Sequence, residues 1–166
     1  AGLAFAWMMC FLDTVDGKLA RCTLTSTKLG DVFDHGIDLV HPPFWYYAWG
    51  VGLSGITLTP EIAILVGVII AGYVIGRLQE GFFIWRFGLE IHIWRPIDTW
   101  FRLITARRNP NLILLMIFAF VGRPDLGLWA VAVWTVVSLA FHFLRIGQAE
   151  IATRRGPIAS WLAEPA

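Results

Sequence analysis

The chain has 166 residues, of which 57% are hydrophobic and only 15% are charged. A soluble domain carries about 25% charged residues, so the composition excludes an ordinary water-exposed domain and indicates that lipid is the solvent for much of the surface. The net charge of +1 gives no electrostatic reason to expect nucleic-acid binding.

Apolar runs follow one another along the chain and are separated by charged clusters. The five runs cover residues 1–12, 39–58, 62–76, 112–121 and 126–144. A membrane-spanning helix needs about 20 residues, so the second and fifth runs are long enough by themselves. The third needs Pro60 and Glu61 to approach that length, and the fourth needs a helix that begins among residues 104–109. We therefore predict an all-α, multi-pass transmembrane bundle with about five helices, forming a single domain over residues 1–166.

The basic residues are distributed unevenly over this layout. If successive runs cross the bilayer, residues 13–38, 77–108 and 145–166 lie on the same side. Of the 13 Lys and Arg residues, all but Arg123 fall in these segments. The positive-inside rule makes that side cytoplasmic, and we expect the membrane to be a bacterial inner membrane.

The segment 77–108 mixes many aromatic residues with Arg, Glu and Asp. This mixture favours a chain that lies at the cytoplasmic interface, with rings at headgroup depth and basic tips in water. A solvated cytoplasmic hairpin is the alternative. Arg77, Arg107 and Arg108 flank apolar runs on this side, where they either anchor the helices or bind a phosphate of the lipid substrate or acceptor.

Residues 12–40 read LDTVDGKLARCTLTSTKLGDVFDHGIDLV and follow the spacing D-x2-D-G-x2-A-R-x8-G-x3-D-x3-D. The four aspartates are Asp13, Asp16, Asp34 and Asp38. At about 100° per residue, each pair falls on one face of a helix. A short turn near residues 23–26 lets the two faces oppose each other. We therefore predict four carboxylates gathered at the cytoplasmic mouth of a helix pair.

Such a cluster needs cations, because neighbouring carboxylates disfavour each other's ionised form. Mg²⁺ is bound by carboxylates together with substrate phosphates and water. Two such ions about 3.5–4 Å apart can clamp a phosphoryl group during its displacement. Small residues on the same faces, Gly17, Ala20 and Gly30, leave room for a helix or a nucleotide to approach closely. The pattern favours phosphoryl-type transfer with metal ions.

At every defined position this pattern resembles the signature of the CDP-alcohol phosphotransferase family, which are integral membrane enzymes of phospholipid synthesis. The resemblance implies displacement of CMP from a CDP-alcohol, such as CDP-diacylglycerol, by an acceptor hydroxyl. At least one of the two substrates would be a lipid. It also implies a homodimer.

The resemblance assigns roles to individual residues. Asp13, Asp16, Asp34 and Asp38 would hold two divalent cations, Mg²⁺ or Mn²⁺. Asp38 would also accept the proton of the attacking hydroxyl. The residues that would line the CDP site are Gly17, Ala20 and Arg21.

The sequence departs from the family pattern in one respect and leaves the substrates open. Family members have six transmembrane helices, so we expect a first helix to be missing before residue 1. Residues 33–38, FDHGID, are similar to the choline and ethanolamine phosphotransferase branch, whose members are much longer. The CDP-bearing substrate is either diacylglycerol-linked, with a small polar acceptor, or a small alcohol, with diacylglycerol as acceptor.

Other polar residues near the motif have more ordinary interpretations. Asp31 shares the face of Asp34 but lies outside the signature, where a carboxylate at a helix start is favoured by the helix dipole. His41 lies one turn beyond Asp38 and is either a packing residue or a neighbour of the acceptor. The remaining histidines, interpreted as structural or interfacial, are His35, His92 and His142.

Two other classes of protein also place carboxylates in membranes. An intramembrane Mg²⁺-dependent prenyltransferase uses aspartate clusters, but with a different spacing. An ion or metal transporter would distribute carboxylates across the membrane depth, whereas here all four are expected at one end. Metal-dependent CMP release, as against metal flux in liposomes, separates these possibilities.

Overall fold

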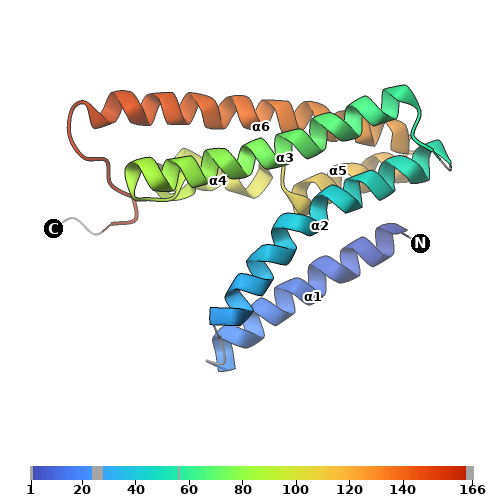
Figure 1. Cartoon of the computed structure of the whole chain (residues 1–166), viewed down its shortest axis with the longest axis horizontal. Helices are drawn as coiled ribbons and strands as arrows, with labels where there is room; N and C mark the ends of the chain where they lie inside the picture. The colour runs from blue at the N-terminus through green and yellow to red at the C-terminus, as the bar shows by residue number, and fades with distance from the viewer. Residues whose placement is uncertain (1, 24–27, 56, 164–166) are drawn as a thin grey trace.

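The computed structural model describes residues 2–23, 28–55 and 57–163; within the first two helices, the side chains of residues 13, 16, 17, 20, 21, 23, 28–35, 37 and 38 lie outside this description. The described chain is all-α, as predicted, and contains six α-helices and one short 3-10 helix (Figure 1). The elements are α1 (Gly2–Thr23), α2 (Lys28–Ser54), α3 (Pro60–Phe87), η1 (Ile91–Ile93), α4 (Pro96–Ile104), α5 (Arg108–Phe120) and α6 (Pro124–Thr153).

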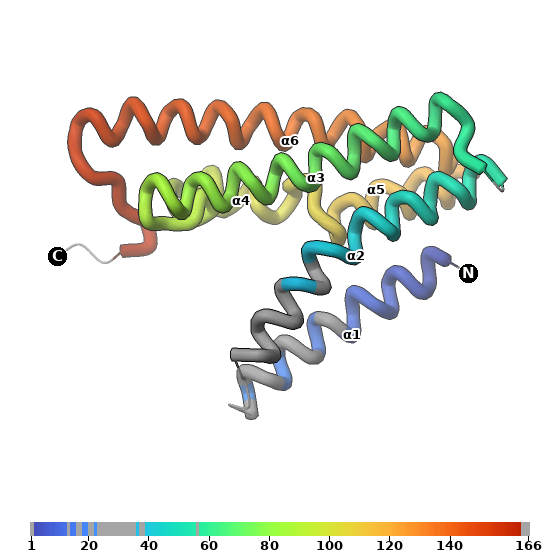
Figure 2. Tube along the Cα trace, viewed as in Figure 1, coloured from blue at the N-terminus to red at the C-terminus, as the bar shows by residue number. Residues whose placement is uncertain are grey.

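Helices α3 and α6 lie side by side and run in the same direction (Figure 1). Near their starts, Trp129 Nε1 donates to Glu61 Oε1 at 3.3 Å, and near their ends Arg86 pairs with Glu150 at 2.8 Å. Helix α5 packs against α6 and runs in the opposite direction, and the described part of α2 packs beside α3 and α5 (Figure 2). The alternating directions of α3, α5 and α6 are those expected of apolar runs that cross a bilayer in turn.

The core of the bundle lies where these helices meet. Its buried residues are Tyr46, Leu65, Val66, Ile69, Leu115, Leu128, Val131 and Ala132. One polar contact is enclosed beside it: Asn111 Nδ2 donates to the hydroxyl of Tyr46 at 2.6 Å. Because lipid tails are as apolar as leucine, close packing and internal hydrogen bonds hold such helices together.

Helix α3 has clear signals at both ends. Thr59 caps it by accepting from the Ile62 N–H, and Pro60 occupies the first turn, where its missing N–H costs nothing. At the other end Gly88 adopts φ +72°, a left-handed conformation that glycine tolerates best, and its N–H donates to Ile84 O. The prediction that the third apolar run recruits Pro60 and Glu61 is therefore confirmed.

The same helix continues to Phe87, well into the segment that we predicted to lie at the interface. Its 28 residues extend for about 42 Å, which exceeds the hydrocarbon thickness of about 30 Å. The last turns of α3 therefore reach beyond the hydrocarbon, so the irregular part of the segment 77–108 is shorter than expected. Helix α4 exposes Ile97, Trp100 and Leu103, which favours an interfacial location over a solvated hairpin.

Two of the described helices, α3 and α6, are each long and apolar enough to cross a bilayer. Helix α5 begins at Arg108, within the predicted window of residues 104–109. Its 13 residues extend for only about 20 Å. The residues before it, up to Ile104, belong to the separate helix α4. The crossings beyond α3 and α6 stay predictions.

Candidate functional site

The four predicted metal ligands fall within the bounds of two consecutive helices, α1 and α2. Helix α1 ends at Thr23 and α2 begins at Lys28, close to the predicted turn. The predicted gathering of the carboxylates depends on side chains outside the described residues, and it stays a prediction. The predicted site residues outside the description are Asp13, Asp16, Gly17, Ala20, Arg21, Asp34 and Asp38.

Beside the part of α2 that follows Asp38, the structure contains two adjoining cavities of about 370 and 540 Å³. Pro42 lines the smaller one and Leu39 lines the larger one. We call the two together the arginine cavity. The arginines that line both parts are Arg77, Arg102 and Arg107.

The arginine cavity has a positive balance of charge. Arg108 lines its smaller part, and two carboxylates, Glu80 and Glu90, line the larger part. Among the described side chains, four arginines and two glutamates line the cavity, and a cleft with such an excess of basic groups attracts anions. Arg77, Arg107 and Arg108, which the sequence places on one side of the membrane, line one cavity in the structure.

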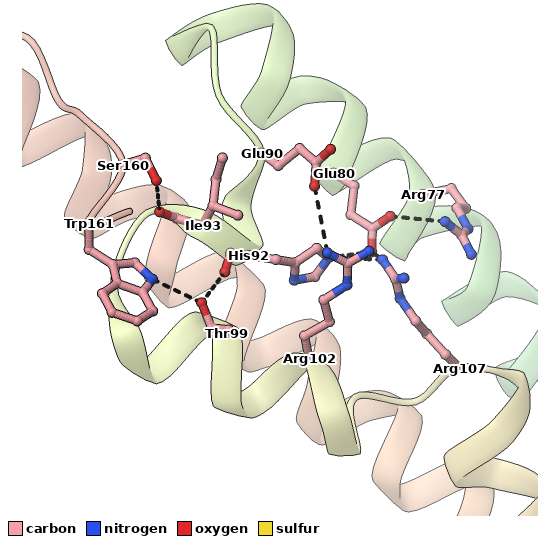
Figure 3. A network of polar contacts seen from close by, with 10 residues as sticks. All are labelled: Arg77, Glu80, Glu90, His92, Ile93, Thr99, Arg102, Arg107, Ser160 and Trp161. Atoms are coloured by element: carbon pink, nitrogen blue, oxygen red, sulfur yellow. Dashed lines mark hydrogen bonds and ion pairs between the residues drawn. The ribbon is translucent and has the colours of Figure 1, made fainter. Parts of the chain in front are cut away.

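Glu80 organises the arginines (Figure 3). Its Oε1 accepts from Arg107 Nη2 at 2.5 Å, and its Oε2 accepts from Arg77 Nη1 at 3.1 Å. Arg102 Nη1 lies 3.8 Å from Glu90 Oε2. Because each guanidinium carries five donors, these contacts hold the arginines in place and leave donors for a further acceptor.

His92 lies against the same carboxylate from η1. The side chain is buried, and its Nε2 lies 3.2 Å from Glu80 Oε1 and 2.8 Å from Arg107 Nη2. A neutral ring with its proton on Nδ1 accepts from Arg107, whereas a ring protonated on Nε2 donates to Glu80. Thr99 Oγ1 donates to the backbone carbonyl of His92 at 2.7 Å. The interpretation of His92 as structural is thus confirmed in part, since it is buried, but its partners line the cavity.

A second chain of contacts ties the C-terminal segment to the same region (Figure 3). Ser160 Oγ donates to Ile93 O at 2.8 Å, and Trp161 Nε1 donates to Thr99 Oγ1 at 3.0 Å. Thr99 is the residue that holds the His92 carbonyl. Ser160 and Trp161 therefore hold η1, which carries His92, in place against α4.

Sequence reasoning missed Glu80, Arg102 and His92 as parts of a site. The spacing of Arg77 and Glu80 on one helix was a usable signal, because residues three apart are neighbours on a helix surface. The contacts of Glu80 with Arg107 and His92 join residues 27 and 12 positions apart. No local pattern reports a contact of that kind.

His41 lies on α2 and faces α1 and α5 rather than the arginine cavity. It lines a small gap of about 10 Å³ together with Cys10, Trp45 and Leu112. Its Nδ1 is buried and has no hydrogen-bond partner among the described residues. These surroundings favour the packing interpretation of His41 over a place beside the acceptor.

Within the described side chains, no group of three His, Cys, Asp or Glu residues could hold a metal ion, and the motif aspartates lie outside that set. The donor set in the motif consists of four carboxylates. Hard cations such as Mg²⁺ and Mn²⁺ prefer oxygen ligands of this kind, so the residues fit the implied metals by chemistry.

Comparisons with known proteins address the same region. Curated proteins named ethanolaminephosphotransferase 1, from Homo sapiens, Pongo abelii and Mus musculus, are each 33% identical to this chain over 73 residues. The alignment covers 42% of this chain and 18% of each relative, so the chain matches less than a fifth of their length. No solved structure matches the chain.

The sequence model of the CDP-alcohol phosphatidyltransferase family matches residues 1–107. The match covers more than half of the chain, from α1 to the arginine that precedes α5. It therefore contains the whole aspartate pattern as well as Arg77, Glu80 and Arg107. This chain belongs to the CDP-alcohol phosphatidyltransferase family, the metal-dependent, membrane-embedded transferases of phospholipid synthesis.

Proposed function

We propose that this chain displaces CMP from a CDP-alcohol by the hydroxyl of an acceptor, at the cytoplasmic face of a bacterial inner membrane. One observation carries the proposal. The full aspartate pattern lies inside the family match, and its two halves fall on the consecutive helices α1 and α2. The proposed unit is a single domain over residues 1–166 that acts as a homodimer.

The proposed site uses the aspartates in two ways. Asp13, Asp16, Asp34 and Asp38 hold two divalent cations, which would offset the charge of the substrate phosphates. Asp38 takes the proton of the acceptor hydroxyl as that oxygen attacks the β-phosphorus and CMP leaves. The residues proposed to line the CDP site are Gly17, Ala20 and Arg21.

The family match and the pattern disfavour the two rival classes. A prenyltransferase or a metal transporter would share the carboxylates but not the spacing of the eight defined residues in the pattern. If the chain were a transporter, metal flux into liposomes would exceed that of empty liposomes, and CMP would not be released. We expect metal-dependent CMP release and no flux.

The decisive test compares Asp34→Asn and Asp38→Asn with the unchanged protein, purified with Mg²⁺ and supplied with CDP-alcohol and acceptor. CMP release should fall by at least about 100-fold in each variant, as expected for loss of a positioned base or ligand. Asp125→Asn is the matched control, because Asp125 lies at the start of α6, is exposed and pairs only with Arg123 among the described residues. Full activity in the Asp34 and Asp38 variants would contradict the proposal.

Metal dependence is tested separately by removal with a chelator. CMP release should be lost and then recovered with added Mg²⁺ or Mn²⁺. The carboxylates and the substrate phosphates are all negative, and they repel one another unless cations lie between them. Retention of full activity after exhaustive chelation would exclude the two-metal site.

The substrates are tested with two labelled donors. One incubation contains CDP-diacylglycerol with a panel of small acceptors, and the other contains CDP-ethanolamine with diacylglycerol. The second arm is included because of the partial similarity to proteins named ethanolaminephosphotransferase. A lipid product in one incubation shows which substrate carries the CDP group. If neither incubation gives a product, both proposed substrate pairs are contradicted.

A further inference from the structure

We infer that the arginine cavity and an adjoining apolar groove form one binding site for an anionic phospholipid of the bilayer. The groove has a volume of about 680 Å³ and lies between the end of α4, the start of α5 and the first turns of α6. Its lining residues include Ile113, Ala130, Val133 and Trp134. The phosphate would lie on the arginines and one acyl chain would lie in the groove.

The groove and the cavity adjoin. Leu103 at the end of α4 and Pro110 in the first turn of α5 line both the groove and the smaller part of the cavity. A lipid whose phosphate lies on the arginines can therefore reach the groove past these two side chains. The site combines a cluster of guanidinium groups with an apolar channel, which is the chemistry of a lipid with an anionic head.

The walls of the groove offer little to a polar ligand. Trp134 Nε1 donates to Ile104 O at 2.6 Å, and Trp129 Nε1 donates to Glu61 Oε1 at 3.3 Å. Because both indole N–H groups are already used, these rings present apolar surface to the groove. Its occupant must be a hydrocarbon.

The depth of each part agrees with this occupant. Arg77 lies about 26 Å along α3 from Pro60, close to the far edge of a hydrocarbon layer about 30 Å thick. Trp129 and Val133 lie about 8 and 14 Å along α6 from Pro124, inside that layer. The groove therefore begins at Leu103 and Pro110, near the arginines, and extends past the middle of the bilayer to Trp129, which bonds Glu61 in the first turn of α3. It is long enough to take one acyl chain.

The charges select an anionic head. Among the described side chains, four arginines and two glutamates line the cavity, and the buried Arg107 Nε has no hydrogen-bond partner within that set. Guanidinium groups bind phosphate through paired N–H donors. A zwitterionic head brings its own cation into this positive cavity, so it should bind more weakly than phosphatidic acid.

The test measures lipid binding to the whole purified chain in neutral detergent, without nucleotide or metal. Phosphatidic acid with a brominated acyl chain should quench the fluorescence of Trp129 and Trp134. The double variant Arg77→Gln/Arg102→Gln should raise the concentration for half-maximal quenching by about tenfold or more, given the strength of charge-assisted hydrogen bonds. Arg123→Gln, an exposed arginine at the other end of the bundle, should leave it unchanged.

A second variant addresses the groove. Ala130→Phe fills the groove without touching the arginines, and it should weaken quenching by phosphatidic acid while inorganic phosphate remains a poor competitor. Two results would overturn the inference. One is an unchanged midpoint in the double arginine variant; the other is weakened binding in that variant together with an unchanged midpoint in Ala130→Phe, which would mean that phosphate alone is recognised.

Lipid binding and CMP transfer can fail separately. Asp38→Asn should retain quenching by brominated phosphatidic acid, because the inferred site uses neither the metals nor the proposed base. Quenching lost in Asp38→Asn but retained in the arginine variant would also overturn the inference. A chain that binds the lipid but never releases CMP would contradict only the proposed function.

Discussion

At the scale of single residues, a buried ion pair between Asp98 and Arg145 fixes α4 on α6. Arg145 Nε donates to Asp98 Oδ1 at 2.5 Å and Nη2 donates to Oδ2 at 2.7 Å. The same guanidinium lies over the ring of Trp94, 4.4 Å from its centroid. From the sequence, Arg145 was one of many basic residues on the cytoplasmic side. The structure gives it a specific partner 47 positions away.

Removal of one member of this pair should be costly. The Asp98 side chain is 2% exposed, so Arg145→Met leaves a buried carboxylate without its partner, and the free energy of unfolding should fall by about 3–5 kcal/mol. Denaturant unfolding in detergent, followed by tryptophan fluorescence, measures the change. Arg154→Met removes an exposed arginine of the same segment and should change stability by less than about 0.5 kcal/mol. Equal losses in the two variants would show that the pair contributes nothing specific.

At the scale of elements, the contact between α3 and α6 depends on a missing side chain. A Cβ atom at Gly72 would lie 2.2 Å from Thr135 Cγ2. Thr135 cannot turn away without giving up the hydrogen bond from its Oγ1 to Val131 O, which measures 2.8 Å. Gly72 therefore sets how closely the two longest helices approach.

Gly72→Ala should destabilise the protein by about 1–3 kcal/mol, because the added methyl overpacks the contact. Gly67→Ala is the matched control on the same helix, since a Cβ there meets nothing within 4 Å. It should be neutral or stabilising by up to about 1 kcal/mol, because alanine favours helix more than glycine does. Thr135→Ser removes the methyl group and keeps the hydroxyl, so it should restore much of the stability lost in Gly72→Ala. Thermal unfolding in detergent checks all three, and no rescue by Thr135→Ser would show that the contact is not the cause.

Element boundaries followed the sequence where local chemistry decides them. Thr59, Pro60 and Gly88 start and stop α3 through capping, a fixed φ and a left-handed turn. The length of α3 was harder to predict, because the charged residues Arg77 and Glu80 ended the apolar run without ending the helix. Within the helix Arg77 pairs with Glu80, and Glu80 also pairs with Arg107.

At the scale of the whole molecule, the asymmetry of basic residues predicts the orientation in the membrane. Glu90 follows the end of α3 and Arg123 precedes the start of α6, so the two positions lie at opposite ends of the parallel pair α3 and α6. Both side chains are exposed. Single cysteines at these positions therefore report opposite membrane faces.

In a background with Cys10 and Cys22 replaced by alanine, a cysteine at position 90 should react with an impermeant maleimide only from the cytoplasmic side. A cysteine at position 123 should react only from the other side. Spheroplasts expose the outer face of the membrane to the reagent, and inverted vesicles expose the cytoplasmic face. The cysteine-free protein controls for labelling at other residues. The reverse pattern would mean that the positive-inside rule fails here and that the proposed site faces away from the cytoplasm.

The sequence by itself determined the all-α class, the start of α3, the basic side and the family, because apolar length, capping residues, charge asymmetry and the spacing from Asp13 to Asp38 are all properties of neighbouring residues. Only the tertiary structure decided that Glu80 binds both Arg77 and Arg107, that Arg145 meets Asp98, and that the cavity adjoins the groove at Leu103 and Pro110. Apart from the pair Arg77 and Glu80 on α3, these contacts join residues on different elements. Their geometry depends on how the helices pack, and no pattern along the chain carries that information.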